Sequence, residues 1–143
     1  MQDLEIAREC LKEKHLTLCI VKEAEVIFET RSHGISGFLK AVEEFEDRLM
    51  GASVADRVVG KAVALLCIYA EVSGVYASTL SRKAKQLLEE NAIHVEYGDL
   101  VENVLGTDKA TACPFEKTAA EIADPRDAYR KLKALHDSLR KCR

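Results

Sequence analysis

The side chains with the clearest chemical potential gather at the start of one apolar segment, residues 53–70. Ser53 and Asp56 stand near its beginning, and Lys61 is the one charged residue between positions 58 and 70. A carboxylate can transfer a proton or bind a hydroxyl or an amine, and an ammonium group can neutralise a phosphate. We therefore interpret Asp56 and Lys61 as candidate catalytic residues and Ser53 as a ligand-binding residue.

A plainer interpretation stands beside each of these assignments. Asp56 follows Ser53 by three residues, which is the spacing of a capping box, so its carboxylate can simply cap its own helix. Lys61 can extend its stem along apolar surface and place its ammonium group in water. Gly60 weakens a helix, which suggests that a ligand approaches closely and makes it a candidate ligand-binding residue, but a packed neighbouring element is the plainer explanation.

Cys113 is the best candidate nucleophile among five scattered cysteines. It precedes Pro114, so it occupies the cap position of a predicted helix, where the positive end of the helix favours a thiolate. Lys117 adds positive charge there and Glu116 opposes it; we include both in the candidate site. The alternative is that Cys113 only caps the helix. His33, beside a glycine in a predicted loop, is either a base that faces the ligand or a solvated side chain.

The order of predicted elements positions these residues. We expect helices over 3–14, 35–50, 53–70, 81–91 and 98–105, two more that begin at 113 and 124, and strands over 16–21, 26–30, 74–80 and 93–97. The short link between the first two strands predicts an antiparallel hairpin. The later strands alternate with helices and are predicted to be parallel. The fold class is thus α/β: a three-layer α/β/α sandwich with a mixed sheet of about four or five strands.

Two helix starts are expected to meet at one edge of this sheet. In the predicted arrangement the helix of residues 53–70 begins at Ser53, and the next helix begins at Ser81, which we assign as a cap and a ligand-binding residue. Helix starts attract anions and phosphates because their first N–H groups have no intrahelical acceptor. The predicted site therefore suits a nucleotide-like small molecule.

Several motifs together resemble a known family. The runs Gly51-Ala-Ser-Val-Ala-Asp-Arg-Val-Val-Gly-Lys-Ala62, Gly74-Val-Tyr-Ala77 and Cys113-Pro-Phe-Glu-Lys117 resemble a prokaryotic domain-of-unknown-function family. The resemblance implies a cytidine-deaminase-like fold without the zinc ligands, over nearly the whole chain. The run from Val54 to Val58 looks like the start of the zinc helix in cytidine deaminases, which would put Asp56 in place of the catalytic glutamate.

The same comparison argues against a zinc-dependent deaminase. Such an enzyme needs three His or Cys ligands and a glutamate that shuttles protons. The positions that would supply ligands hold Val54, Ser81 and Ala84, none of which binds zinc as a thiolate or an imidazole. We expect no metal and no cofactor, and we leave open whether the protein is an enzyme of another kind.

Composition sets the remaining limits. A chain of 143 residues with net charge −3 predicts one domain, residues 1–143, without general affinity for nucleic acid. The unpaired pattern of five cysteines and the absence of a signal peptide or a long apolar segment predict a cytoplasmic protein that does not enter a membrane. Residues 1–124 carry a net charge of −8 and residues 125–143 of +5, so the last helix could dock an acidic partner or merely face solvent.

Two functions follow from these patterns. The first is the binding or modification of a nucleoside- or nucleotide-like small molecule at the start of the apolar helix. The second is a non-catalytic interaction module that has the fold without the chemistry and works through its basic last helix or a sheet edge. A homo-oligomer is compatible with either.

Overall fold

The computed structural model describes residues 2–32, 35–102 and 114–141. A five-stranded mixed sheet runs through it in the order β2-β1-β3-β4-β5. The strands are β1 (Leu18–Lys22), β2 (Glu25–Thr30), β3 (Ser53–Val59), β4 (Gly74–Ser81) and β5 (His94–Val101). The helices are α1 (Gln2–Glu13), α2 (Ser36–Phe45), a 3-10 helix η1 (Glu46–Leu49), α3 (Lys61–Ala70), α4 (Arg82–Glu90), α5 (Pro114–Ala119) and α6 (Pro125–Lys141).

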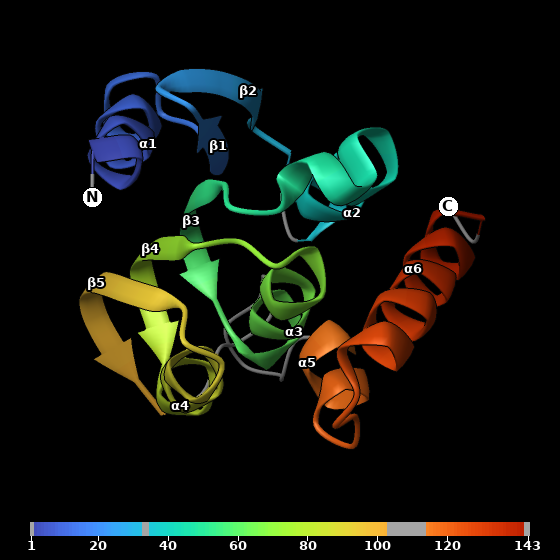
Figure 1. Ribbon diagram of the computed structural model, residues 1–143. Helices are drawn as coiled ribbons and strands as arrows, with labels where there is room; N and C mark the ends of the chain where they lie inside the picture. The colour runs from blue at the N-terminus through green and yellow to red at the C-terminus, as the bar shows by residue number, and fades with distance from the viewer. Residues whose placement is uncertain (1, 33–34, 103–113, 142–143) are drawn as a thin grey trace.

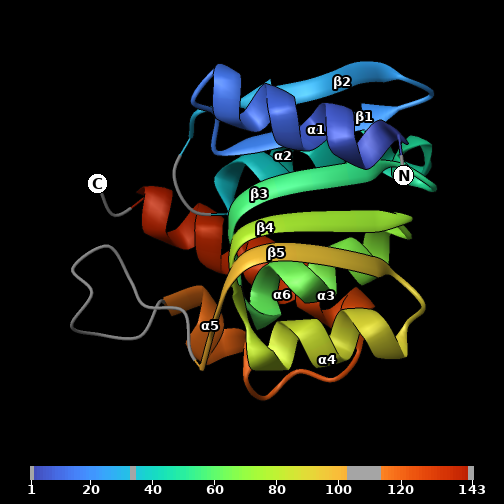
Figure 2. The same ribbon diagram turned by 90° about the vertical axis from the view of Figure 1, so that its left-hand side faces the viewer.

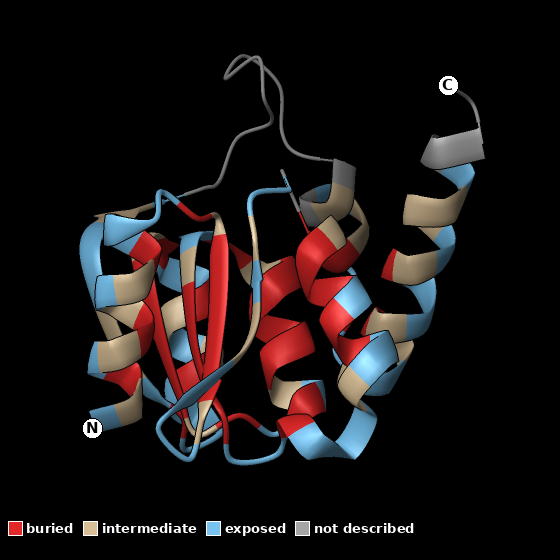
Figure 3. Ribbon diagram, turned by 90° about the horizontal axis from the view of Figure 1, so that it is seen from above, coloured by how far each residue is buried: buried red, intermediate tan, exposed pale blue. Residues whose placement is uncertain are grey.

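The helices lie on both faces of the sheet, as Figures 1 and 2 show. One face packs on α1 through a small cluster that includes Leu4, Leu11, Val21 and Ala55. The other face packs on α2, α3 and α4 through the main core, with α5 and α6 outside α3. Figure 3 shows this core as the buried layer between the strands and the helices. The predicted three-layer α/β/α sandwich is confirmed.

The hairpin of β1 and β2 is closed by two residues in the left-handed region, Glu23 with φ 52° and Ala24 with φ 65°. Two such residues in a row match the twist of the strands but are strained for residues other than glycine. Asp3, in the first turn of α1, accepts hydrogen bonds from both of their N–H groups, at 3.1 and 3.0 Å. The opening helix thus holds the turn, and the predicted antiparallel pairing is confirmed.

The sequence prediction was wrong for residues 53–59. This segment is β3, which pairs antiparallel with β1 and parallel with β4, and the apolar helix begins only at Lys61. The segment contains Val54, Val58 and Val59, and β-branched residues favour strands. It pairs with β1 over residues 53–56 and with β4 up to Val59, and this pairing outweighs the capping-box pattern at its start.

A second error concerns the predicted helix over residues 98–105. Residues 98–101 continue β5, and residues 103–105 lie outside the described chain. Gly98 fits the strand because its backbone passes close to β4: a Cβ atom there would lie 2.9 Å from the Ser78 carbonyl oxygen. A glycine inside a strand often marks such a close approach.

The parallel part of the sheet is as predicted, since β3, β4 and β5 run in one direction. Ser81 caps α4: its Oγ accepts a hydrogen bond from the Ala84 N–H at 3.2 Å. Asp124 caps α6, and its carboxylate accepts from the Arg126 N–H at 2.9 Å. No helix within residues 2–32, 35–102 and 114–141 is long and apolar enough to cross a membrane.

Two buried serines test this assignment of the elements. Ser81→Ala removes a cap and should lower the free energy of unfolding by about 1 kcal/mol. Ser53 is buried within β3, and its Oγ has no hydrogen-bond partner among the described residues. Ser53→Ala should therefore leave the stability unchanged or raise it by up to about 1 kcal/mol. Urea denaturation of both variants makes the comparison; a loss at Ser53 equal to that at Ser81 would contradict the strand assignment.

Candidate functional site

The carboxyl ends of β3 and β4 lie side by side, with Val59 paired to Leu80. Directly after them, α3 begins at Lys61 and α4 begins at Arg82, on the same face of the sheet (Figure 1). The predicted meeting of two helix starts is therefore present in the structure. It is built by Gly60 and Ser81, however, and not by Ser53 and Ser81.

Gly60 caps α3 instead of lying in the second turn of a longer helix. Its carbonyl accepts the first intrahelical hydrogen bond, from the Ala64 N–H at 3.0 Å. Its φ of −106° is open to any residue, so this position does not demand glycine for its backbone. The predicted destabilising glycine inside the helix is therefore corrected to a glycine at the cap.

Asp56 lies three residues before the end of β3, where it is paired with Leu18 of β1 and Ala77 of β4. It shares a sheet face with Val54, which belongs to the core under α3. Its nearness to α3 is also evident at Cys67, whose pKa is raised by burial and then by the Asp56 carboxylate. The carboxyl group therefore points into the layer between the sheet and α3.

Burial raises the pKa of Asp56 to about 7. The N–H groups of Val58 and Arg57 oppose this shift, and the first donates to Oδ1 at 3.2 Å. Both are neutral donors, so they reduce the cost of a buried charge without cancelling it. At neutral pH the group is poised between a carboxylate and a carboxylic acid, which suits proton transfer or a switchable hydrogen bond.

Asp56 cannot correspond to a residue at the start of a zinc helix, because it stands on a strand. The predicted equivalence of residues 54–58 with that helix start is therefore wrong, and so is the capping role of Asp56. Ser53 and Asp56 also fail to converge: they are three apart on one strand, so their side chains point to opposite faces of the sheet. Ser53 lies on the α1 face, away from the candidate site.

Lys61 stands at the first position of α3 and is partly exposed. Its Nζ donates to the Ala120 carbonyl oxygen at 3.0 Å, directly after α5. Its ammonium group thus lies where the carbonyls of a helix end favour a cation. This contact directs the Lys61 side chain toward α5, and its assignment as a catalytic residue stays a prediction.

Four other predicted site residues lie in or next to the parts of the chain that the structure does not describe. Cys113 and His33 lie outside the described residues, and the side chain of Glu116 is likewise outside them. Lys117 is exposed on α5. These four assignments stay predictions.

One polar contact was not predicted from the sequence. His136 of α6 places Nε2 2.8 Å from the Ser36 Oγ at the start of α2, although 100 residues separate them. Nothing in the spacing of the four histidines indicates this pairing, because it depends on how α6 packs beside α2.

A further polar contact involves Arg57 of β3. Its guanidinium group donates a hydrogen bond from Nε to the Leu16 carbonyl oxygen and fixes the entry into β1.

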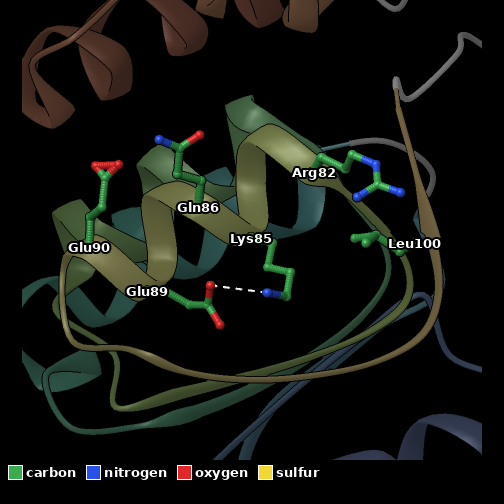
Figure 4. A pocket seen from close by; sticks show the side chains of 6 residues that line it. All are labelled: Arg82, Lys85, Gln86, Glu89, Glu90 and Leu100. Atoms are coloured by element: carbon green, nitrogen blue, oxygen red, sulfur yellow. Dashed lines mark hydrogen bonds and ion pairs between the residues drawn. The ribbon is translucent and has the colours of Figure 1, made fainter.

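Two hollows that the described residues form lie elsewhere. One of about 410 Å³ lies between α4 and β5, and Figure 4 shows that it is lined by charged side chains, including the Lys85–Glu89 ion pair. A second of about 480 Å³ lies beside the stacked rings of Tyr69 and Tyr129. Neither contains a predicted site residue. In the part of the chain that the structure describes, no three His, Cys, Asp or Glu side chains are placed to hold a metal ion.

Comparison with known proteins identifies the family. Residues 6–135 match a family described as a domain of unknown function, DUF1893. The chain belongs to the DUF1893 family. The crystal structure of a DUF1893 protein from Thermotoga maritima is similar over 93% of this chain and 89% of that one, with 29% sequence identity and a TM-score of 0.85. The predicted membership of a domain-of-unknown-function family is confirmed.

More distant structures include deaminases. RibD from Acinetobacter baumannii is 19% identical, with a TM-score of 0.49, over 84% of this chain and 37% of that one. The dCMP deaminase of the cyanophage S-TIM5 is 12% identical, with a TM-score of 0.48, over 67% of this chain and 94% of that one. No curated protein gives a significant match.

The cysteines of this DUF1893 protein differ in their predicted reactivity. Burial, followed by the neighbouring Cys10, raises the pKa of Cys19 to about 12, and Cys67 is fully buried with a raised pKa. Alkylation of the native protein, followed by peptide mapping, should modify Cys113 first and leave Cys19 and Cys67 last. If Cys113 lags behind Cys10 or Cys142, the helix-start argument for a reactive thiolate fails.

The raised pKa of Asp56 predicts a pH-dependent stability. An unfolded aspartate titrates near 3.8, so between about pH 4 and pH 7 only the folded state keeps the proton. Stability then falls as pH rises, by up to about 1.4 kcal/mol per pH unit, and is level above pH 7. Asp56→Asn cannot ionise and should lack this loss in urea titrations.

Asp99→Asn, at an exposed position of β5, serves as the matched control because it removes a carboxylate without opening the core. A wild-type stability that follows the Asp56→Asn curve across this pH range would show that Asp56 ionises normally.

Proposed function

We propose that this DUF1893 protein binds a nucleoside- or nucleotide-like small molecule at the carboxyl edge of β3 and β4, with Asp56 as the recognising group. The observation that carries the proposal is the carboxyl group of Asp56, a partly exposed residue whose pKa is raised to about 7 by the burial of that group. Burying such a group costs stability, and strongly perturbed titratable groups concentrate at functional sites.

The hydrogen-bonding capacity of Asp56 suits a nucleobase-like edge. A protonated carboxyl group offers one donor and one acceptor side by side, whereas a carboxylate only accepts. Nucleobases present neighbouring donors and acceptors on their edges, and a carboxyl group is among the side chains that pair with them. A group with a pKa near 7 reaches either form at low cost, and it can also transfer a proton to or from the ligand.

The helix starts beside this edge suit the anionic part of such a ligand. The first N–H groups of α3 and α4 point toward the edge, where the helix dipoles favour negative charge. Lys61 and Arg82, the first residues of these helices, add two cations. Arg82 pairs with Glu102 on the open surface, an interaction of little energetic weight that a phosphate can replace.

Ligand binding should stabilise the protein against heat. A thermal-shift screen of nucleosides, mononucleotides and dinucleotides should identify at least one compound that raises Tm, because a ligand that binds only the folded state shifts the unfolding equilibrium. Lys61→Met keeps most of the apolar stem and removes the charge. We expect its affinity for a phosphorylated ligand to fall about tenfold, as expected for the loss of one charge-assisted contact.

The Lys61 substitution should leave the free energy of unfolding within about 1 kcal/mol, since the bond to Ala120 is exposed. Lys40→Met, at an exposed position of α2, is the matched control and should not change affinity for a phosphate held at the start of α3. A screen in which no compound raises Tm would contradict the proposal. An unchanged affinity of Lys61→Met for a phosphorylated ligand would remove the assigned phosphate site.

A further inference from the structure

Ser36 and His136 form a hydrogen-bonded pair outside the Asp56 site. Ser36 Oγ lies 2.8 Å from His136 Nε2, and both side chains are partly buried. A hydroxyl within hydrogen-bond reach of an imidazole is the arrangement that activates serine as a nucleophile. The side chain of His136 is 23% exposed, so the pair remains reachable from solvent.

The backbone around Ser36 supplies donors for a developing negative charge. Ser36 is the first residue of the ten-residue helix α2, and its N–H and those of Gly37 and Phe38 have no intrahelical acceptor. The cap residue, Ile35, has no side chain that could bind them. The N–H of the residue after a nucleophilic serine serves as an oxyanion donor in acyl-transfer sites that open a helix.

Apolar surface flanks the pair. The ring of Phe115, from α5, is tilted by 36° against the His136 ring, with 6.5 Å between the ring centroids. This aromatic wall suits a small acyl group and lowers the access of water to one side of the imidazole. The four parts therefore come from three elements, and α6 packs against both of the others, α2 and α5 (Figure 1).

We propose that Ser36 and His136 form an acyl-transfer site that accepts esters of small carboxylic acids. The Ser36 oxygen attacks the carbonyl carbon while its proton moves to His136 Nε2. The first-turn N–H groups of Gly37 and Phe38 bind the resulting oxyanion. Collapse breaks the bond to the alcohol, which leaves with the proton from His136, and Ser36 holds the acyl group.

Water completes the reaction. It attacks the acyl carbon, gives its proton to His136, and the bond to Ser36 breaks as His136 returns that proton to the serine oxygen. The products are the carboxylic acid and the free enzyme. Asp137 Oδ1 lies 3.7 Å from His136 Nδ1, too far for a hydrogen bond, so the structure assigns a pair and not a triad.

Reaction with a fluorophosphonate tests this site without a known substrate. The full-length protein is incubated with the probe, and the modified residue is located by peptide mass mapping. We expect one adduct per chain, on Ser36. Ser36→Ala should lose it, and His136→Gln should slow its formation by about a hundredfold or more, because general base catalysis contributes at least that factor.

Ser138→Ala is the matched control, because Ser138 is exposed on α6 two residues from His136 and should not affect labelling. Hydrolysis of p-nitrophenyl acetate should follow the same order among the variants. Absence of an adduct on Ser36 in the wild-type protein overturns the proposal whether or not the variants fold. Equal labelling rates for the wild type and a folded His136→Gln variant overturn the role of His136.

Discussion

The parallel pairing of β3 with β4 is the constraint on which the rest of the structure depends. Parallel neighbours cannot be joined by a tight turn, so the chain must cross over the sheet, and α3 is that crossover. Because both strands then end at one edge, two helices start there. The same crossover lays an apolar helix over the face of the sheet that carries Asp56 and removes much of the water that a hairpin connection would leave around its carboxyl group.

Enclosing Asp56 has an energetic consequence. The carboxyl group receives hydrogen bonds from neutral backbone donors, and burial remains the dominant influence on its pKa. A sheet position that faces a helix ordinarily holds an apolar side chain, and Val54 and Ala77 are examples in this sheet. A carboxyl at such a position lowers stability above neutral pH. This energetic cost favours a functional role for Asp56 over such a role for the more exposed charged residues of the molecule.

The sequence predicted elements whose signals are local. The hairpin follows from two short strands with a four-residue link, α6 from the Asp124–Pro125 start, and α4 from Ser81. The family was also accessible, because its motifs span most of the chain. Residues 53–59 were mispredicted because a charged pair, Asp56-Arg57, interrupts the valines and because Ser53 and Asp56 match a capping box. Only the neighbouring strands reveal that this segment is central to the sheet.

The structure arranges the predicted site residues differently from the sequence prediction. Ser81 was expected at a helix start and caps α4, whereas Lys61 was expected inside a longer helix and stands at the start of α3. Ser53 faces α1, and Asp56 lies deeper in the sheet. The pairing of Ser36 with His136 joins residues 100 positions apart. Such a contact is set by helix packing, which leaves no periodic pattern in the sequence.

The fold places the carboxyl group of Asp56 in the layer under α3, and burial there raises its pKa. Carbon-13 NMR of the aspartate carboxyl groups against pH measures this directly, with Asp56→Asn used to assign its resonance. We expect the Asp56 signal to titrate with a midpoint near pH 7. A midpoint near pH 4, the ordinary value for an aspartate in water, would contradict it.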